Sequence, residues 1–170
     1  MGLLAGGCRT APSGSSPAAT APPSGLTPAQ RRYLGLAEGT PFAFERVRGE
    51  ILIVELFDMY CRVCQQSAPK LKELYRLIHD RGLDRRIKMV AIGAGNTSLE
   101  AEMYRRKFQP AFPVLPDRDK KLTRQLGSPH TPALVALRLG SGKVEPFYTH
   151  VGYLRDPDKV LEEILAKAGR

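Results

Sequence analysis

The sequence predicts an α/β fold in which a central mixed β-sheet is flanked by helices. Two near-continuous apolar runs, at residues 51–57 and 87–92, have the pattern of strands that are covered on both faces. Segments with helical character follow each run. Two later apolar segments are joined by Gly140-Ser-Gly142, which is typical turn chemistry. Alternation of strands and helices favours parallel pairing, and the hairpin adds antiparallel strands, so a mixed sheet is expected.

Two central helices are predicted from apolar spacing and from a capping motif. Apolar residues recur at helical spacing over residues 66–80. Thr97-Ser-Leu-Glu100 is a capping box, in which each end of the motif satisfies a free backbone N–H of the other. The helix that it opens is expected to carry Leu99, Met103 and Phe108 on one apolar face.

The remaining elements are shorter or lie near the C-terminus. In chain order they are an entry strand at 42–47, an extended piece at 110–116, a helix at 117–126 stopped by Gly127, hairpin strands at 133–139 and 143–148, and a final helix that begins after Asp156 and ends at Gly169. Pro157 suits the first position of that last helix because its missing N–H would have no partner there.

Composition divides the chain at residue 25. Residues 9–25 consist almost entirely of Ala, Pro, Ser, Thr and Gly, with no aromatic side chain and no aliphatic one larger than alanine. Such a segment buries too little apolar surface to offset its ordering entropy, so we expect residues 1–25 to form a start and a tether. Residues 26–170 have the length of one ordinary domain.

The segment before the tether, Met1-Gly-Leu-Leu-Ala-Gly-Gly-Cys8, resembles the cleavage box of bacterial lipoproteins. The resemblance implies that Cys8 is lipidated and that the domain is extracytoplasmic, or periplasmic, and tethered to a bacterial membrane. The match is partial, since Ala5 stands where the box prefers leucine and a basic start is missing. The alternative is a free cysteine on an unstructured end.

Charge and apolar length limit the classes of partner. The net charge is +9, from 26 basic and 17 acidic residues, but the basic clusters are short and scattered. No basic motif interleaved with aromatic residues is present, so we expect no nucleic-acid partner. No run approaches the roughly 20 apolar residues that span a membrane. We expect a monomer.

The motif that carries chemistry is Cys61-Arg-Val-Cys64, at the junction between the first apolar strand and the following helix. At a helix N-terminus, free N–H groups and the helix dipole stabilise an anion, so Cys61 is expected to act as a thiolate. Cys64 lies one turn further in and should be more buried. Cys61 would attack a partner disulfide, and Cys64 would resolve the mixed disulfide.

A cysteine pair at this spacing has other uses in proteins. A structural zinc site needs about four ligands, but the chain has no second C-x-x-C, and its three histidines are widely spaced. A structural disulfide across a two-residue loop would stabilise the fold only weakly. A chaperone for a soft metal such as Cu(I) would use the same two thiolates and is kept as an alternative.

The chain resembles the thioredoxin superfamily, in particular its membrane-tethered periplasmic branch of thiol–disulfide oxidoreductases, which contains the cytochrome c maturation thioredoxins. Four separated features carry the resemblance: the Cys61-Arg-Val-Cys64 unit, Pro69, Thr131-Pro132 and Val151-Gly152. Residues 87–112 look like the inserted helix and strand that distinguish this branch. The resemblance implies a thioredoxin-like fold over most of the chain.

The resemblance also implies roles for residues outside the pair. Pro132 matches the family's cis-proline, which places the backbone of Thr131 beside the cysteines to pair with an extended substrate. Its alternative is an ordinary loop proline. Glu55 stands where thioredoxin carries a buried acid; burial would raise its pKa and let it accept the Cys64 proton. Alternatively, Glu55 faces solvent or pairs with a basic residue.

The residues around the pair depart from the family's common pattern. Tyr60 stands where a tryptophan is usual and could form the apolar lip beside Cys61. Arg62 would stabilise a neighbouring thiolate, which makes a couple more oxidising. Together with Val63 and Thr131, these residues are expected to contact the substrate.

The function implied is that of a tethered reductase of disulfides in exported proteins, with apocytochrome c among the candidate substrates. It needs no cofactor beyond its own redox-active disulfide and would receive electrons from a membrane donor. An oxidant or isomerase of the same fold, which Arg62 favours, and a copper chaperone stay open as alternatives. A peroxidase is disfavoured because Asp58 and Met59 precede Cys61 without the Pro-x-x-x-Thr motif.

Overall fold

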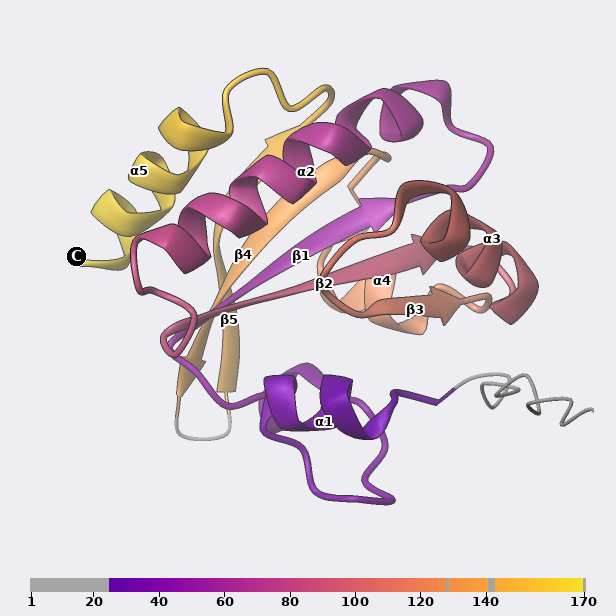
Figure 1. Ribbon diagram of the computed structural model, residues 1–170, viewed down its shortest axis with the longest axis horizontal. Helices are drawn as coiled ribbons and strands as arrows, with labels where there is room; N and C mark the ends of the chain where they lie inside the picture. Colours follow the sequence, from indigo (N-terminus) through magenta and orange to yellow (C-terminus); the bar gives the residue numbers. More distant parts are fainter. Residues whose placement is uncertain (1–24, 128, 141–142, 170) are drawn as a thin grey trace, which may run out of the picture.

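The computed structural model describes residues 25–127, 129–140 and 143–169, and its centre is a five-stranded sheet (Figure 1). The strands are β1 Ile51–Phe57, β2 Ile87–Ala94, β3 Val114–Asp117, β4 Ala133–Gly140 and β5 Lys143–Val151. Their order across the sheet is β3-β2-β1-β4-β5. β1, β2 and β3 pair in parallel, and β4 is antiparallel to both β1 and β5. The predicted mixed α/β sheet is therefore confirmed.

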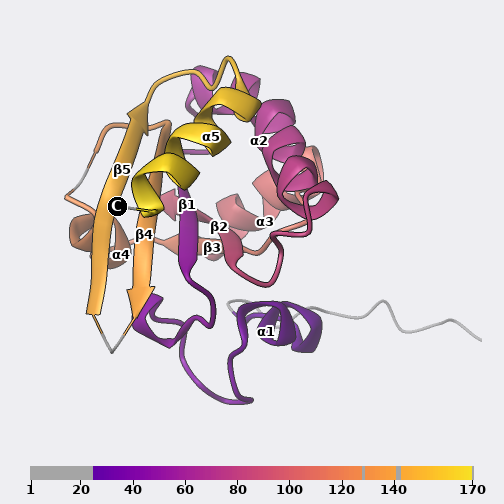
Figure 2. The ribbon, with the colours of Figure 1, turned by 90° about the vertical axis from the view of Figure 1, so that its left-hand side faces the viewer.

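Helices cover both faces of the sheet. They are α1 Pro28–Leu34, α2 Arg62–Asp80, α3 Ser98–Phe108, α4 Lys121–Gln125 and α5 Pro157–Ala168, with a short 3₁₀ helix, η1, at Phe44–Arg46. One core contains apolar residues of α2, α3 and α5, and a second core contains those of α1, η1 and α4. Figure 2 shows α2 and α3 on one side of the strands and α4 on the other. Helix α1 was not predicted.

The central strand β1 is buried along its whole length and divides its side chains between the two cores. Ile51, Ile53 and Phe57 face the core under α2, whereas Leu52, Val54 and Leu56 face the other core. Because side chains alternate along a strand, Glu55 shares the face of Ile53 and Phe57. The one acidic residue of β1 therefore points toward the layer that holds α2 and α3.

Three local expectations were wrong. The helix predicted at 117–126 is shorter, because Asp117 ends β3 and α4 spans only Lys121–Gln125. Residues 42–47 form no strand but contain the 3₁₀ helix η1. Its buried residues Phe44 and Val47 are three apart, a spacing that puts both on one side of a 3₁₀ turn.

The expected apolar face of α3 is also wrong. Leu99 and Met103 are 70% and 44% exposed, whereas Ala101 and Tyr104 are buried and Phe108 only partly so. The hydroxyl of Tyr104 donates a hydrogen bond to Glu55, and its ring stacks on Phe57. These contacts favour the helix orientation in which Tyr104, rather than Leu99, enters the core.

Most helix ends agree with the sequence. Thr97 caps α3 through the predicted capping box, Asp156 caps α5 with Pro157 at its start, and Gly127 has a left-handed φ of 77°. Helix α2 begins four residues before the predicted residue 66, directly after Cys61. No helix of residues 25–127, 129–140 and 143–169 is both long and apolar enough to cross a membrane. Cys8 and the tether up to residue 24 lie outside the described residues.

Candidate active site

The loop that leads from β1 to α2 is held by a side chain from the neighbouring strand connection. Asn96, buried just after β2, accepts a hydrogen bond from Met59 N at 2.9 Å through Oδ1 and donates from Nδ2 to Asp58 Oδ1 at 3.2 Å. Asp58 Oδ1 also accepts from Tyr60 N at 3.0 Å. Cys61 therefore follows a loop whose backbone is fixed on the side of β2. Sequence analysis missed Asn96 because nothing local marks a residue that acts 37 positions away.

The two cysteines occupy different environments. Cys61 is the N-cap of α2, and its Sγ accepts a hydrogen bond from Cys64 N at 3.2 Å. Cys61 is half-buried, whereas Cys64 is fully buried, and both are free thiols. Burial, followed by the neighbouring Cys61 thiol, raises the pKa of Cys64 well above its ordinary value. Cys61 thus has access to a partner and a donor to its sulfur, while Cys64 stays protonated behind it.

Residues far along the chain form the opposite wall of the site. The Thr131–Pro132 peptide bond is cis, and the carbonyl oxygen of Thr131 lies 3.8 Å from Cys61 Sγ. The carbonyl of buried Pro132 accepts from Gly152 N at 2.8 Å. Gly152 has a φ of 100°, which glycine adopts without strain. The two resemblance features Thr131-Pro132 and Val151-Gly152 are thus joined beside the cysteines.

Glu55 lies on the face of β1 that α2 and α3 cover, and it is almost completely buried. It is 1% exposed, and its Oε1 accepts a hydrogen bond from the Tyr104 hydroxyl at 2.9 Å. Burial raises the pKa of Glu55 from 4.5 to about 8, an effect that the Tyr104 hydrogen bond partly offsets. Its Oε2 is the buried side-chain oxygen without a partner among the described residues. The alternatives of a solvent-facing or ion-paired Glu55 are wrong, and Tyr104 is a further residue that sequence analysis missed as a site residue.

The three residues expected to contact substrate next to the pair are all exposed. Tyr60 is 71% exposed, and the adjacent carboxylate of Glu100 raises the pKa of its hydroxyl. Val63 and Arg62 are exposed on the first turn of α2. Arg62 takes part in none of the ion pairs found among the described residues. The residues that flank Cys61 are therefore open to a partner molecule.

Helix α3 contacts both the cysteine loop and helix α2. Its Glu100 carboxylate interacts with Tyr60, and its Lys107 Nζ donates to Gln65 Oε1 of α2 at 2.8 Å. Leu99, Met103 and Lys107 are spaced four residues apart and so form one stripe along the helix. The Tyr60–Glu100 contact thus brings the first turn of α3, which carries the exposed Leu99, next to the cysteine loop.

The exposed large apolar side chains of the described residues come from three segments: the cysteine loop with the first turn of α2, helix α3, and residues 151–153. Those found in the described residues form what we call the apolar rim: Tyr60, Val63, Leu99, Met103, Val151 and Tyr153. Tyr153 lies near α2, because the next residue, Leu154, donates its N–H to Ser67 Oγ. Val151 pairs with Ala133, directly after the cis-proline. A set of exposed apolar side chains on segments that adjoin the site is suited to bind a polypeptide.

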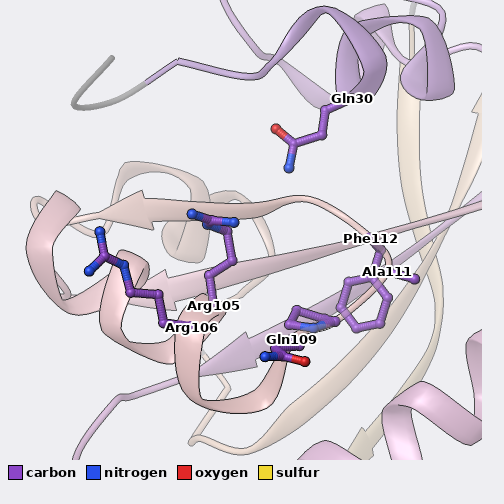
Figure 3. Close-up of a pocket in the computed structure, with 7 residues that line it drawn as sticks. Gln30, Arg105, Arg106, Gln109, Ala111 and Phe112 are labelled. Atoms are coloured by element: carbon purple, nitrogen blue, oxygen red, sulfur yellow. The ribbon is translucent and has the colours of Figure 1, made fainter. Parts of the chain in front are cut away.

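Features outside this site offer less chemistry. In the described ranges, no group of three or more His, Cys, Asp or Glu side chains could hold a metal ion. An open pocket of about 530 Å³ lies between α1 and the end of α3, where Gln30 faces Arg105, Arg106 and Gln109 (Figure 3). Both arginines bind Glu102 of their own helix, and neither cysteine lines the pocket.

Comparison with known proteins agrees with this geometry. A family model described as Thioredoxin-like matches residues 49–144. The thiol-disulfide oxidoreductase ResA of Geobacillus thermodenitrificans is 24% identical over 127 residues, which cover 75% of this chain and 70% of the relative. Further ResA proteins, from Geobacillus kaustophilus and Bacillus cereus, are covered over 64% and 63% of their length. The chain thus spans about two thirds of the relatives it matches.

Solved structures share the fold at low sequence identity. A secreted disulfide oxidoreductase of Mycobacterium tuberculosis, homologous to DsbE of E. coli, superposes with a TM-score of 0.59 at 18% identity, covering 75% of this chain and 90% of that one. StoA of Bacillus subtilis gives a TM-score of 0.54 at 17% identity, covering 69% of this chain and 84% of StoA. At this identity the likeness concerns the fold.

Proposed function

Because the chain belongs to the thioredoxin-like family, we propose that it is a thiol–disulfide oxidoreductase that reduces disulfides in exported proteins. The observation that carries the proposal is the asymmetry of the cysteine pair. Cys61 caps α2 at the accessible end, whereas Cys64 is buried and its pKa is raised. An accessible attacking sulfur backed by a protected second thiol is the arrangement that two-step disulfide exchange requires.

The exchange runs in two steps. The Cys61 thiolate attacks one sulfur of the substrate disulfide, forms a bond to it and releases the other sulfur, which takes up a proton. Cys64 then gives its proton to Glu55 and attacks Cys61 Sγ, so that a Cys61–Cys64 disulfide forms and the second substrate thiol leaves. Two electrons pass from the protein to the substrate, and no further cofactor takes part.

The surroundings of Cys61 support a polypeptide substrate. The apolar rim offers contacts for side chains that flank a substrate cysteine. The Thr131 carbonyl, 3.8 Å from Cys61 Sγ, offers a backbone acceptor for an extended segment. Unfolded exported proteins, with apocytochrome c among the candidates, expose both apolar side chains and free backbone N–H groups.

Location and supply of electrons follow from the same proposal. Lipidation at Cys8 would anchor the domain outside the cytoplasm, and residues 9–25 would let it reach its substrates. A membrane protein would return electrons to the Cys61–Cys64 disulfide. The secreted disulfide oxidoreductase of M. tuberculosis, which shares the fold, supports an extracytoplasmic site of action.

Arg62 favours a second candidate, an oxidant or isomerase of the same fold. Its exposed guanidinium follows Cys61 directly and is used in none of the described ion pairs. A cation there stabilises a thiolate, which favours the reduced pair and raises the reduction potential.

One pair of measurements tests the function and its direction. The reduced protein should cleave the disulfides of insulin, and the Cys61→Ala variant should not. The reduction potential, measured by equilibration with dithiothreitol or glutathione, should lie closer to the value of thioredoxin, about −270 mV, than to that of DsbA, about −120 mV. A potential near the DsbA value would show an oxidant, and tight Cu(I) binding without insulin cleavage would overturn the oxidoreductase proposal.

A further inference from the structure

Tyr104 places its hydroxyl against Glu55 from the inserted helix α3, and aromatic rings fix its position. The side chain is 1% exposed and packs face to face with Phe57, at 3.9 Å between ring centroids and an interplanar angle of 25°. The ring of Phe108 also packs against the Tyr104 ring, at 4.7 Å between centroids and an interplanar angle of 50°. With its ring held in this way, the hydroxyl donates to Glu55 Oε1 at 2.9 Å. The contact therefore depends on the rigid placement of α3 against β1.

The bond to Tyr104 distinguishes the two oxygens of Glu55. Oε1 is occupied, whereas Oε2 is buried and has no partner among the described residues. The neighbours of Glu55 across the sheet, Ala91 on β2 and Leu134 on β4, carry no charge. The thiols of Cys61 and Cys64 lie close enough to Tyr104 for their negative charges to raise the pKa of its hydroxyl. Among the described residues, Oε2 is thus the carboxylate oxygen that is free to take up a proton.

We propose that Tyr104 is a positioning residue for the resolving step, holding Glu55 by Oε1 so that Oε2 receives the proton of Cys64. The proposal rests on the proposed disulfide exchange and deepens it. As the proton moves from Cys64 Sγ to Glu55 Oε2, the sulfur bonds to Cys61 Sγ. The bond between Cys61 and the substrate sulfur breaks, and that sulfur leaves with the electron pair. The hydrogen bond also stabilises the ionised carboxylate, which is the form that can accept the proton.

A second tyrosine provides a matched control. Tyr148 on β5 is also buried and donates to a glutamate, Glu163 on α5, at the same distance of 2.9 Å. This pair belongs to neither the cysteine loop nor the Glu55 contact. Removing each hydroxyl by substitution with phenylalanine deletes one tyrosine–glutamate hydrogen bond while keeping the ring.

The test separates attack from resolution in a single reaction. Reduced full-length proteins carrying Cys8→Ser, so that only the pair reacts, are mixed with the chromogenic disulfide dithiobis-nitrobenzoate in a stopped-flow instrument. The first released thiol reports attack by Cys61, and the second reports resolution by Cys64. In the Tyr104→Phe variant, the pH at which the second phase reaches half its maximal rate should rise by about one unit, the size expected for one lost hydrogen bond to a charged group. The first phase should keep its profile, and Tyr148→Phe should change neither phase.

Several outcomes would overturn the proposal. An unchanged midpoint in Tyr104→Phe, or a second phase slowed equally at every pH, would show a purely structural tyrosine. If that variant does not fold, carbon NMR of the wild-type protein decides, because the Tyr104 ring carbon that bears the hydroxyl should titrate with the same midpoint as the Glu55 carboxyl. Different titration midpoints for the Tyr104 ring carbon and the Glu55 carboxyl would show that Tyr104 does not act on Glu55. Failure of the proposed function would appear differently, as a wild-type protein without a first phase.

Discussion

Glu55 places an ionisable group in the core, on the face of β1 that α2 and α3 cover. Its carboxyl is buried on β1, hydrogen-bonded only to Tyr104 among the described residues, and its pKa rises from 4.5 to about 8 because burial disfavours the charged form. The folded protein therefore binds the Glu55 proton more tightly than the unfolded chain does. This stabilisation is complete below about pH 4.5 and is lost as the pH rises through about 8.

The Glu55→Gln variant tests this linkage, since glutamine keeps the shape and stays neutral at every pH. Between about pH 5 and pH 8, the unfolding free energy of the wild-type protein should fall relative to that of the variant by about 1.4 kcal/mol per pH unit. Urea unfolding of both reduced proteins across this range gives the difference. Parallel stability curves would mean that Glu55 titrates in the folded state as it does in the unfolded chain.

At the scale of elements, the connection between β2 and α3 supports the start of α2. Asn96 in that connection bonds to Met59 and Asp58, just before the cysteine that caps α2. It approaches β2 closely at Gly93, where an added Cβ would lie 2.9 Å from Asn96 Cβ and 3.1 Å from Phe57 Cζ. The absence of a side chain at Gly93 is what lets these groups meet.

Gly93→Ala should therefore overpack this junction and destabilise the protein by about 1–3 kcal/mol. Because Asn96 must shift, thiol exchange at Cys61 should slow as well. Gly140→Ala on β4 is the control, since its added Cβ meets no atom within 4 Å. Thermal unfolding of the two variants compares them; equal melting temperatures would contradict the close packing at Gly93.

At the scale of the whole molecule, much of the sheet and of the site's centre could be predicted from the sequence. Buried strands leave continuous apolar runs, and the C-x-x-C motif at a strand-to-helix junction places Cys61 at a helix N-terminus. The resemblance directed attention to Glu55, which the structure buries against Tyr104, and to Pro132, which follows the Thr131 carbonyl beside Cys61. Their catalytic roles remain predictions.

What could not be predicted depends on contacts between distant segments. The spacing of Leu99 and Met103 is that of a buried face, yet the bond between Tyr104 and Glu55 gives α3 another orientation and leaves both exposed. No local pattern indicates whether the face with Leu99 and Met103 or the face with Ala101 and Tyr104 packs against the core. The same holds for Asn96, whose partners lie one strand away.

The central claim is that Cys61 attacks and Cys64 resolves, and trapping of the intermediate tests it most directly. The Cys64→Ala variant, in a Cys8→Ser background, should accumulate a covalent adduct with insulin that dithiothreitol releases, with mass spectrometry locating the bond at Cys61. The Cys61→Ala variant should form little or none, because Cys64 is buried and its pKa is raised. An adduct formed equally through Cys64, or no adduct through Cys61, would contradict the account.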